Sequence, residues 1–443
     1  MSDDIRLPTF KEAFFVWLRI GLLSFGGPAG QIALMHKTLV EEKRWISNDH
    51  FMHALNYCHF LPGPEAQQLA TYVGWLLHRT PGGIVAGTLF VLPGFFVILT
   101  LSFLYAVYRH VPAVDAFFYG LKPAVLAIVI GAVLRIGSKS LKNTFSLGLA
   151  VAAFLCLFAL DIPFPYVIFG AGFLGWVYSR MQAQQGAPGV LPEADLVSQH
   201  KTQCTPGYSL RVLATWLPLW LGPVLLLGFL RGWDDVYTRM GIFFSKMAMV
   251  TFGGAYAVLT YVAQEAVETY SWLTTVDMMN GLAMAESTPG PLILVLQYVG
   301  FIGAYNTPGS LPPVLAGILA SVLVVWVTFT PCFLWIFLGA PYVERIRGNR
   351  NLSAALAGIT SAVVGVIMNL SVWFGMHTLF SSVTQWKGPL GISLPLPDFT
   401  TLDIFALLLS VAAITALTKF KLGMGRVLLG CAVLGWLGKT FIL

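Results

Sequence analysis

Long runs of apolar residues follow one another along most of this chain, and no other feature restricts its fold as strongly. A helix needs about 20 predominantly apolar residues to cross the hydrocarbon core of a bilayer. Short polar or proline-containing turns separate the runs, so each run can form one crossing helix. We therefore predict an all-α polytopic membrane protein. The runs cover residues 83–108, 113–134, 145–160, 163–178, 213–230, 312–338, 352–376, 402–417 and 427–443.

The charge content excludes the common soluble classes. Charged residues make up 10% of the chain, against about 25% in soluble globular domains. So few charges could not cover the surface of a water-soluble fold of 443 residues, which argues against a cytosolic enzyme and a disordered chain. The net charge of +6 comes from Lys and Arg in short loops, which is typical of membrane proteins and is not a footprint for nucleic acid.

No metal or cofactor is expected. His50, His53, Cys58 and His59 suggest a metal site, but they do not share one helix face, and interfacial histidines are the simpler interpretation. None of the cysteines is in a CxxC pair, so we interpret them as small apolar residues of the core. The N-terminal MSDDIRLPTF lacks the charged-then-apolar order of a cleavable signal peptide, so the chain is expected to enter the membrane through its own spans. The cysteines are Cys58, Cys156, Cys204, Cys332 and Cys431.

Four further apolar segments are interrupted by glycine and proline, which end or kink helices. Each piece is about 15 residues long, or ~22 Å of helix, which is too short to cross ~30 Å of hydrocarbon. The pieces are either re-entrant hairpins or helices unwound at mid-membrane, and such backbone survives only when it is buried in protein or lines a cavity. The segments are 10–42 (broken at 24–28), 49–78 (at 61–64), 243–268 (at 251–254) and 277–303 (at 288–291).

The two halves of the chain are repeats. Ser-Phe-Gly-Gly at 24–27 matches Thr-Phe-Gly-Gly at 251–254, and Pro-Gly-Pro at 62–64 matches 289–291, both at an offset of 227 residues. The same offset relates Trp45 to Trp272 and Arg19 to Lys246. Farther along the chain the offset between the repeats increases to 238 residues. We predict a first repeat at 1–180, a hydrophilic cytoplasmic linker at 181–210, a connecting helix at 211–230 and a second repeat at 231–443.

The basic loops predict how the repeats are oriented, because Lys- and Arg-rich loops stay in the cytoplasm. All of the loops 37–44, 135–142, 345–350 and 419–426 face inside if the second repeat is inverted. A parallel repeat would leave one basic cluster outside. If each broken pair makes two crossings instead, Lys43 and Arg44 lie outside. We favour two inverted-topology repeats with broken or re-entrant helices.

The breaks are the predicted substrate site. A helix that restarts at mid-membrane exposes unpaired N–H groups and the positive end of its dipole, which together bind anions. Broken helices at matching positions of inverted repeats are the sequence signature of a transporter's binding site. The alternative is that Gly and Pro only allow close packing. The candidate binding residues are Arg19, Ser24, Gly26, Gly27, Ala29, Gly30, Gln31, Pro62, Gly63, Glu65, Gln67, Gln68, Lys246, Thr251, Gly253, Gly254, Thr288 and Gly290.

Charged residues near the breaks suggest two further roles. Arg19 and Lys246 lie two helical turns before the first glycines of their breaks, where a cation is costly and often functional; the alternative is that they snorkel to the interface. Lys122 is a weaker third cation. Glu65 and Glu286 are candidates for proton coupling, and the alternative for Glu65 is a helix cap. The second half lacks the Glu/Gln cluster, so the site is expected to be asymmetric.

The segments 60–74 (FLPGPEAQQLATYVG) and 25–31 (FGGPAGQ) resemble the hallmarks of the chromate ion transporter family. The second copies, TPGP at 288–291 and FGG at 252–254, resemble the C-terminal domain of the long two-domain form. The second half departs from the pattern by lacking the proline of Gly-Gly-Pro. The resemblance implies export of chromate across the bacterial inner membrane and chromate resistance, with sulfate as a similar anion.

Several alternatives stay open at this point. The chain could take up oxyanion with protons or cations, or form an anion channel. An intramembrane enzyme is disfavoured, because no GxSxG, HExxH or Ser/His/Asp grouping lies at membrane depth, and the chain is not expected to be an enzyme. The expected partners are the oxyanion and the lipid bilayer. The oligomeric state is open, with a homodimer among the alternatives.

Overall fold

The computed structural model describes residues 8–25, 27–184, 206–252, 255–342, 350–389 and 392–441. These residues are almost entirely helical, which confirms the prediction of an all-α polytopic membrane protein. Within the described ranges, five helices are long and apolar enough to span a bilayer: Glu65–Tyr108, Pro112–Ser140, Gly207–Arg231, Pro313–Gly339 and Asn351–Leu379.

The first half consists of helices whose starts are set by local capping. The side chain of Ser47 accepts a hydrogen bond from the His50 N–H, and that of Asn143 accepts one from Ser146, so each satisfies an N–H that the helix leaves unpaired. The elements are α1 (Phe10–Leu23), α2 (Gly27–His36), the π-helix η1 (Lys37–Glu42), α3 (Asn48–His59), α4 (Glu65–Tyr108), α5 (Pro112–Ser140), α6 (Thr144–Phe158) and α7 (Phe164–Gln184).

The second half repeats this order and adds a hairpin. A capping box begins α11, in which the Thr274 side chain accepts from the Asp277 N–H and the Asp277 side chain accepts from the Thr274 N–H. The elements are α8 (Pro206–Arg231), α9 (Val236–Val250), α10 (Ala255–Gln264), the π-helix η2 (Glu265–Thr269), α11 (Thr275–Ser287), the 3₁₀ turn η3 (Leu292–Leu294), α12 (Val295–Asn306), α13 (Pro313–Gly339), η4 (Ala340–Tyr342), α15 (Arg350–Leu379), β1 (Val383–Lys387), β2 (Ser393–Pro397), η6 (Phe399–Thr401), α16 (Ile404–Thr418) and α17 (Met424–Phe441).

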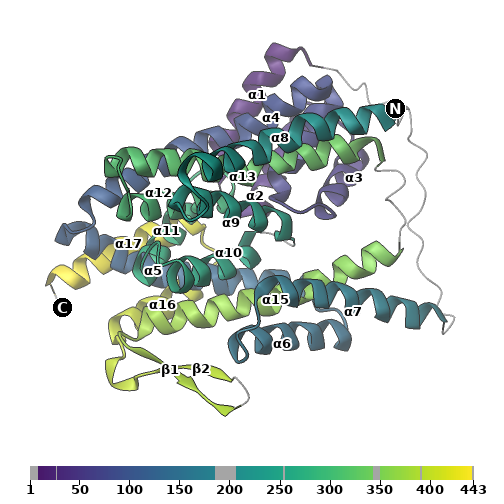
Figure 1. Ribbon diagram of the computed structural model, residues 1–443. Helices are drawn as coiled ribbons and strands as arrows, with labels where there is room; N and C mark the ends of the chain where they lie inside the picture. The colour runs from purple at the N-terminus through teal and green to yellow at the C-terminus, as the bar shows by residue number, and fades with distance from the viewer. Residues whose placement is uncertain are drawn as a thin grey trace.

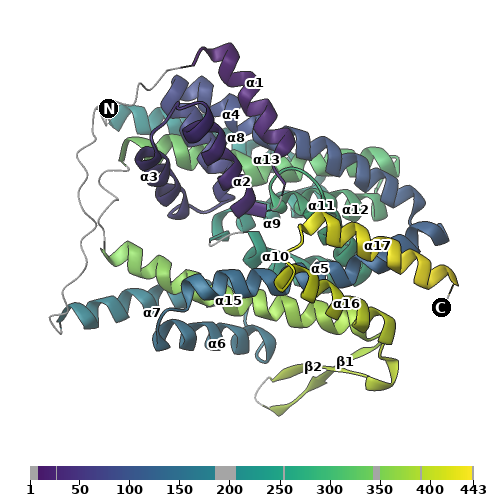
Figure 2. The same ribbon diagram turned by 180° about the vertical axis from the view of Figure 1, so that it is seen from behind.

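The helices lie side by side in layers (Figures 1 and 2). The helix α15 packs against α6 and α7 in one layer, and α5 joins that layer to α16 and α17. In the other layer α13 contacts α12, α8, α9 and α4, and α1 covers α4. Small residues allow close approach between helices: a Cβ on Gly358 of α15 would lie 3.0 Å from the Cα of Gly175 in α7.

Each predicted interruption separates two helices. α1 ends at Leu23 before α2, α3 ends at His59 before α4, α9 ends at Val250 before α10, and α11 ends at Ser287 before η3. The helix α4 is also bent within its length, because His78 and Arg79 have non-helical backbone angles just before Pro81.

Three segments differ from the prediction or fall outside it. Most of the basic loop 37–44 forms the π-helix η1. Leu39 and Trp45 are buried, so this segment packs against the rest of the protein. Within the predicted linker 181–210, α7 continues to Gln184 and α8 begins at Pro206; residues 185–205 lie outside the described ranges, as do most of 345–350. The antiparallel hairpin β1–β2 has no counterpart in the sequence prediction.

The repeats follow the same backbone course. The Lys43 N–H donates to the Thr38 carbonyl at 3.0 Å, and at an offset of 227 the Tyr270 N–H donates to the Glu265 carbonyl at 2.8 Å. These two bonds close η1 and η2, so an unusual helix type recurs at equivalent positions. The next residues, Arg44 and Ser271, both have a φ of 51°.

One pair of equivalent positions, Arg79 and Asn306, lies at opposite ends of the part of α4 that follows its bend. Arg79 begins the segment of α4 beyond its bend, and that segment is about 30 residues, or ~45 Å, long. Its repeat equivalent, Asn306, accepts a hydrogen bond from Arg109 at 3.2 Å, just beyond the far end of the same segment. Since α4 is long enough to cross a bilayer, this is the arrangement expected of inverted repeats.

Candidate functional site

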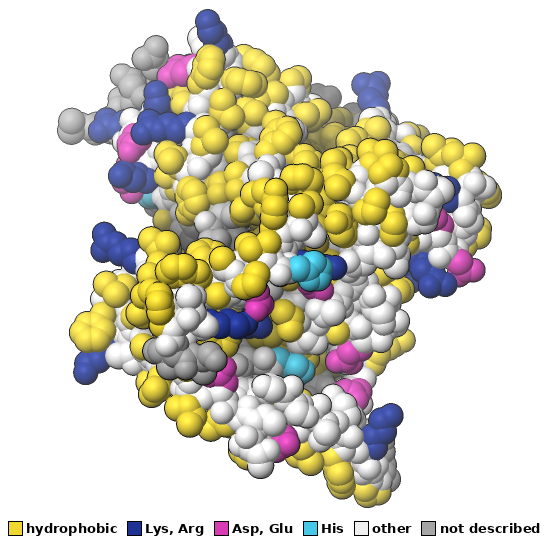
Figure 3. Space-filling view, turned by 90° about the vertical axis from the view of Figure 1, so that its left-hand side faces the viewer, with side chains coloured by type: hydrophobic (Ala, Val, Ile, Leu, Met, Phe, Trp, Pro, Cys, Tyr) yellow, Lys and Arg dark blue, Asp and Glu magenta, His cyan; other side chains and the backbone are white. Residues whose placement is uncertain are grey.

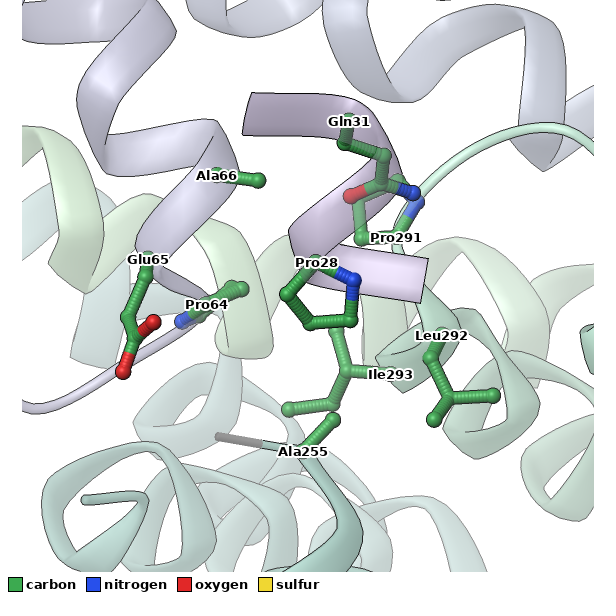
Figure 4. A pocket seen from close by; sticks show the side chains of 9 residues that line it. All are labelled: Pro28, Gln31, Pro64, Glu65, Ala66, Ala255, Pro291, Leu292 and Ile293. Atoms are coloured by element: carbon green, nitrogen blue, oxygen red, sulfur yellow. The ribbon is translucent and has the colours of Figure 1, made fainter. Parts of the chain in front are cut away.

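A small cavity lies where all four interruptions meet (Figure 4). Its volume is about 10 Å³, roughly the space that one water molecule occupies. Both halves contribute to it through the first residues of α2, α4, α10 and η3 or the prolines just before them. The lining residues are Pro28, Gln31, Pro64, Glu65, Ala66, Ala255, Pro291, Leu292 and Ile293.

Two reciprocal backbone hydrogen bonds connect the interruptions of the two halves. The Gly63 N–H donates to the Thr251 carbonyl at 2.8 Å, and the Gly290 N–H donates to the Ser24 carbonyl at 2.8 Å. Gly63 and Gly290 have φ angles of 128° and 100°, which L side chains rarely adopt. Glycine is therefore needed at both positions so that the chain can turn and present its N–H across the interface.

The hydroxyls of Ser24 and Thr251 turn back onto their own helices. Each donates a 2.6 Å hydrogen bond to the carbonyl four residues earlier, Ile20 in α1 and Met247 in α9. This satisfies carbonyls that the ends of α1 and α9 leave unpaired. The hydroxyls therefore shape the interruption, while the backbone carbonyls of the same residues hold the opposite half.

Gln31 of α2 is the uncharged polar side chain in the described lining of the cavity. Its amide nitrogen donates to the Gly290 carbonyl at 2.7 Å and lies 3.5 Å from the Ser24 carbonyl. In Figure 4 its amide extends toward Pro291. The side chain is 1% exposed, and its Oε1 has no hydrogen-bond partner among the described residues. A buried oxygen of this kind can accept a hydrogen bond from a water or from a protonated group.

The helix starts give the cavity a positive character. The first N–H groups of a helix have no partner within it, and the helix dipole adds about half a positive charge at that end. Such an end at Glu65 and Ala66 of α4 and at Ala255 of α10 borders the cavity. Pro28, Pro64 and Pro291 have no N–H and form apolar parts of the wall. Backbone groups are therefore the source of anion-binding capacity here.

Glu65 is the one charged side chain among the described residues that line the cavity. Its Oε1 lies 3.2 Å from Nδ1 of His59, the last residue of α3. The Glu65 side chain is 13% exposed, whereas that of His59 is 46% exposed. In Figure 4 Glu65 lies on the opposite side of the cavity from Gln31. The pair therefore bridges the interruption between α3 and α4. Its net charge is zero when the Glu65 carboxylate is ionised and the His59 imidazole is protonated.

Glu286 of α11 occupies the position that is equivalent to His59 in the other half, again at an offset of 227. It is 7% exposed and accepts a 2.7 Å hydrogen bond from the Tyr256 hydroxyl. Tyr256 follows Ala255, which lines the cavity, and Arg135 of α5 interacts electrostatically with the same carboxyl group. One acidic side chain thus lies beside the cavity in each half, each with its own partner.

Three polar residues of the first half are buried behind the cavity wall. Gln67 donates to the Thr71 hydroxyl at 3.1 Å, and Gln68 donates to the Pro62 carbonyl at 2.8 Å. Neither glutamine lines the cavity. The amide nitrogen of each glutamine thus donates a hydrogen bond within the protein, whereas its Oε1 accepts none from the described residues.

The two cations predicted for the site lie outside the cavity. Arg19 and Lys246 are exposed on the surfaces of α1 and α9, whose buried faces carry Trp17 and Phe244 instead. Lys122 of α5 does not line the cavity either. The repeat register pairs Arg19 with Lys246, but it could not show which way these side chains face.

Some of the other predicted residues are exposed, one is buried, and some lie outside the described ranges. Ala29 and Gly30 are exposed on α2, and Thr288 is buried with its hydroxyl donating to Ala285 at 3.3 Å. Gly26, Gly253 and Gly254 lie outside the described residues. Within the described ranges, no group of three or more metal-ligating side chains comes together.

Several lining residues were absent from the predicted set. Ala66, Ala255, Leu292 and Ile293 have no side-chain chemistry that marks them as functional. The available signal was positional, since each is within the first turn of a helix that restarts after an interruption.

Comparison with known proteins gives a consistent family. A family model described as Chromate transporter matches residues 11–176 and 238–436. A "Chromate transport protein" of Pseudomonas aeruginosa is 30% identical over 438 residues, which is 97% of this chain and 92% of that protein. A protein of the same description from Cupriavidus metallidurans is 25% identical over 96% of this chain and 92% of that protein. A "Probable chromate transport protein" of Synechococcus elongatus is 26% identical over 88% of this chain and 92% of that protein. No solved structure matches the chain.

Proposed function

This chain belongs to the chromate transporter family, and from that premise we propose that it exports chromate across a bacterial inner membrane. The transported species is a tetrahedral oxyanion, so sulfate is expected to compete with chromate. Export of chromate from the cytoplasm would give the cell chromate resistance.

The convergence of four interruptions on one cavity is the observation that supports this proposal. Chromate must shed water at mid-membrane, and the lost hydration has to be replaced by donors. Backbone N–H groups at the starts of α4 and α10 can supply these donors without a permanent positive charge. Weak, backbone-based binding also allows release on the other side.

A change of conformation is part of the proposed cycle. The cavity of about 10 Å³ holds roughly one water, which is less than an ion with four oxygen atoms requires. The two halves must therefore separate around the interruptions to admit the anion. The cross-half bonds Gly63–Thr251 and Gly290–Ser24 would break or lengthen in that step, so we propose that they close the site.

Glu65 is proposed to couple transport to protons. A carboxylate about 4 Å from a dianion repels it by on the order of 8 kcal/mol at an effective dielectric constant of about 20. Binding therefore requires that the acid be neutral, or that it be compensated by His59, 3.2 Å away. Glu286, held by Tyr256 at 2.7 Å, is the proposed coupling residue of the second half.

The membrane potential favours the proposed direction. Moving one charge across 100 mV is worth about 2.3 kcal/mol, so a dianion gains about twice that on leaving a negative interior. Uptake would instead require cotransport of protons or other cations.

Flux of radiolabelled chromate into inside-out vesicles tests the proposal. We expect saturable uptake that sulfate reduces and that an interior-positive potential accelerates. Absence of chromate flux from vesicles that contain correctly inserted protein would contradict it. Flux that neither saturates nor shows competition would indicate a channel, and turnover of a lipid without anion flux would indicate an enzyme.

A further inference from the structure

A second, larger cavity of about 400 Å³ opens at the end of α4 that faces away from its bend. Figure 3 views the protein from the side where this end lies and shows histidine, basic and acidic side chains gathered near the centre of that face. The lining residues are Tyr105, Arg109, His110, Asp115, Phe118, Thr274, Val276, Asp277, Asn280 and Asn306.

Both halves of the protein build this cavity. Tyr105 and Arg109 come from the end of α4, Asp277 and Asn280 come from the start of α11, and Asn306 ends α12. The cavity therefore lies at a junction of the two repeats, and ligand pockets are common at such interfaces.

Asp277 accepts hydrogen bonds from neutral groups of the wall. Its Oδ2 accepts from the Thr274 N–H at 3.0 Å and from the Thr274 hydroxyl at 2.7 Å, and its Oδ1 accepts from the Tyr105 hydroxyl at 2.7 Å. The Asn280 amide holds the Tyr105 hydroxyl from the other side at 3.0 Å. Neutral donors therefore bind both oxygens of this carboxylate, and Arg109 is the cation paired with it.

Arg109 retains unused donor capacity. Its Nη1 pairs with Asp277 at 3.5 Å and its Nη2 donates to Asn306 at 3.2 Å, while its Nε–H is buried without a hydrogen-bond partner among the described residues. The other acid of the wall, Asp115, is paired with Lys439. An arginine with free N–H groups binds tetrahedral oxyanions through two parallel hydrogen bonds.

A second unpaired group lies in the same wall. Asn280 is 3% exposed, and its Oδ1 has no partner among the described residues. This oxygen can accept from the O–H of a protonated oxyanion or of a water that accompanies the ion.

The helix α11 connects this cavity with the interruptions. It runs 13 residues from Thr275 to Ser287, or about 20 Å, and Thr288 of the interruption follows directly. Half of the hydrocarbon core is about 15 Å thick. The larger cavity is therefore at the membrane surface when the four interruptions are near the membrane centre.

We propose that this larger cavity is a vestibule that binds a tetrahedral oxyanion, with Arg109 as its principal donor, before or after the anion passes the interruptions. The inference rests on the proposed function for the identity of the transported anion. The same chemistry is present in a lipid phosphate headgroup, but we assign the vestibule to the free anion because its wall is formed by polar side chains from both repeats.

Protection of an introduced thiol tests binding without any transport. Val276 lines the cavity and is 45% exposed, so Val276→Cys in the full-length chain gives a reporter for a membrane-impermeant maleimide. The chain is placed in phosphatidylcholine nanodiscs, where both faces are accessible, and the unsubstituted chain measures labelling of the native cysteines. We expect saturating sulfate, which unlike chromate does not oxidise thiols, to slow labelling about tenfold, with loss of this protection in Val276→Cys/Arg109→Gln.

Each other outcome counts against the vestibule. Labelling that is insensitive to sulfate would overturn it. Slow labelling in phosphatidylglycerol nanodiscs without added anion, combined with no effect of sulfate in phosphatidylcholine, would assign the cavity to a lipid headgroup instead. Protection that survives Arg109→Gln would remove Arg109 from the site.

Transport provides a second readout with a matched control. We expect Arg109→Gln to raise KM for chromate by roughly tenfold and Arg109→Lys by less, because lysine keeps the charge but loses the paired donors. Arg239→Gln should leave KM unchanged, since Arg239 pairs with Asp234 and does not line the cavity. Protection without any chromate flux would leave the vestibule in place and reject the proposed function, so the two can fail separately.

Discussion

The backbone N–H of Gly63 donates a 2.8 Å hydrogen bond to the carbonyl of Thr251 in the other half of the chain. The same bond recurs with the halves exchanged, from Gly290 to Ser24, again at 2.8 Å. Adding 227 to Gly63 and Ser24 gives Gly290 and Thr251, so exchange of the repeats turns one bond into the other. The two repeats are therefore related by a local pseudo-two-fold symmetry where the four interruptions meet.

The two glycines of this relationship should not tolerate a side chain. A Cβ on Gly290 would lie 3.1 Å from the Cα of Gly94, and one on Gly63 would lie 2.9 Å from the Cys332 Sγ, both at positive φ. We expect Gly290→Ala and Gly63→Ala each to lower the free energy of unfolding by about 1–3 kcal/mol and to reduce chromate flux. Thermal unfolding of the purified protein and flux in vesicles measure the two effects. Gly131→Ala is the control, because a Cβ there meets nothing within 4 Å; equal losses in all three variants would contradict the prediction.

Gln31 should stabilise the contact between the halves. Gln31→Leu keeps a side chain of similar size but removes the 2.7 Å bond to the buried Gly290 carbonyl. Leaving that acceptor short of a donor is expected to cost about 1–3 kcal/mol of stability, and flux should fall with it. Melting temperature with and without the substitution is the measurement, and Gln385→Leu on the exposed strand β1 is the comparison. A melting temperature that Gln31→Leu leaves unchanged would mean that the bond contributes nothing.

Glu286 should contribute to the pH dependence of transport. Glu286→Gln keeps the contact with Tyr256 but cannot gain or lose a proton, so the part of the pH dependence that arises at this residue should vanish. Tyr256→Phe should retain the pH dependence but alter its midpoint, because the carboxyl loses its 2.7 Å donor. Chromate flux measured across a pH series provides the test. An identical profile in Glu286→Gln and in the exposed control Glu41→Gln would exclude Glu286 from coupling.

The ends of η1 and η2 should be on opposite sides of the membrane. Glu42 and Thr269 are exposed, equivalent at an offset of 227, and end the two π-helices. We expect Glu42→Cys to be labelled by an impermeant thiol reagent only from the cytoplasmic side and Thr269→Cys only from the other side. Intact cells and inside-out vesicles give the two measurements. Labelling of both positions from one side would show that the repeats are parallel.

Much of the fold could be predicted because its causes are local. The bilayer requires apolar runs of fixed length, and the breaks at Gly63 and Gly290 follow from the intolerance of helices for glycine and proline. The repeat register could be read directly from Trp45 and Trp272. The hairpin β1–β2 was not predicted, because it lies between two apolar runs and the elements were predicted from such runs.

The backbone of the candidate site and its acid Glu65 were predictable, whereas the positions of the cations were not. Ser24, Gly63, Thr251 and Gly290 were all expected at the interruptions, and the structure joins them in pairs. The side chains of Arg19 and Lys246 face outward, because the rotation of α1 and α9 is set by packing of their apolar faces. The hydrogen bond between Arg109 and Asp277 joins residues 168 positions apart. No local sequence pattern predicts a contact over that distance.

The amino-acid sequence alone determined that this chain is a helical membrane protein with two repeats and four broken segments, because apolar length and glycine or proline placement act on each segment separately. The tertiary structure alone decided that the breaks meet at one cavity and which side chains border it. Those contacts arise between helices distant in the chain, and they depend on how each helix is rotated when all of their apolar faces are packed together.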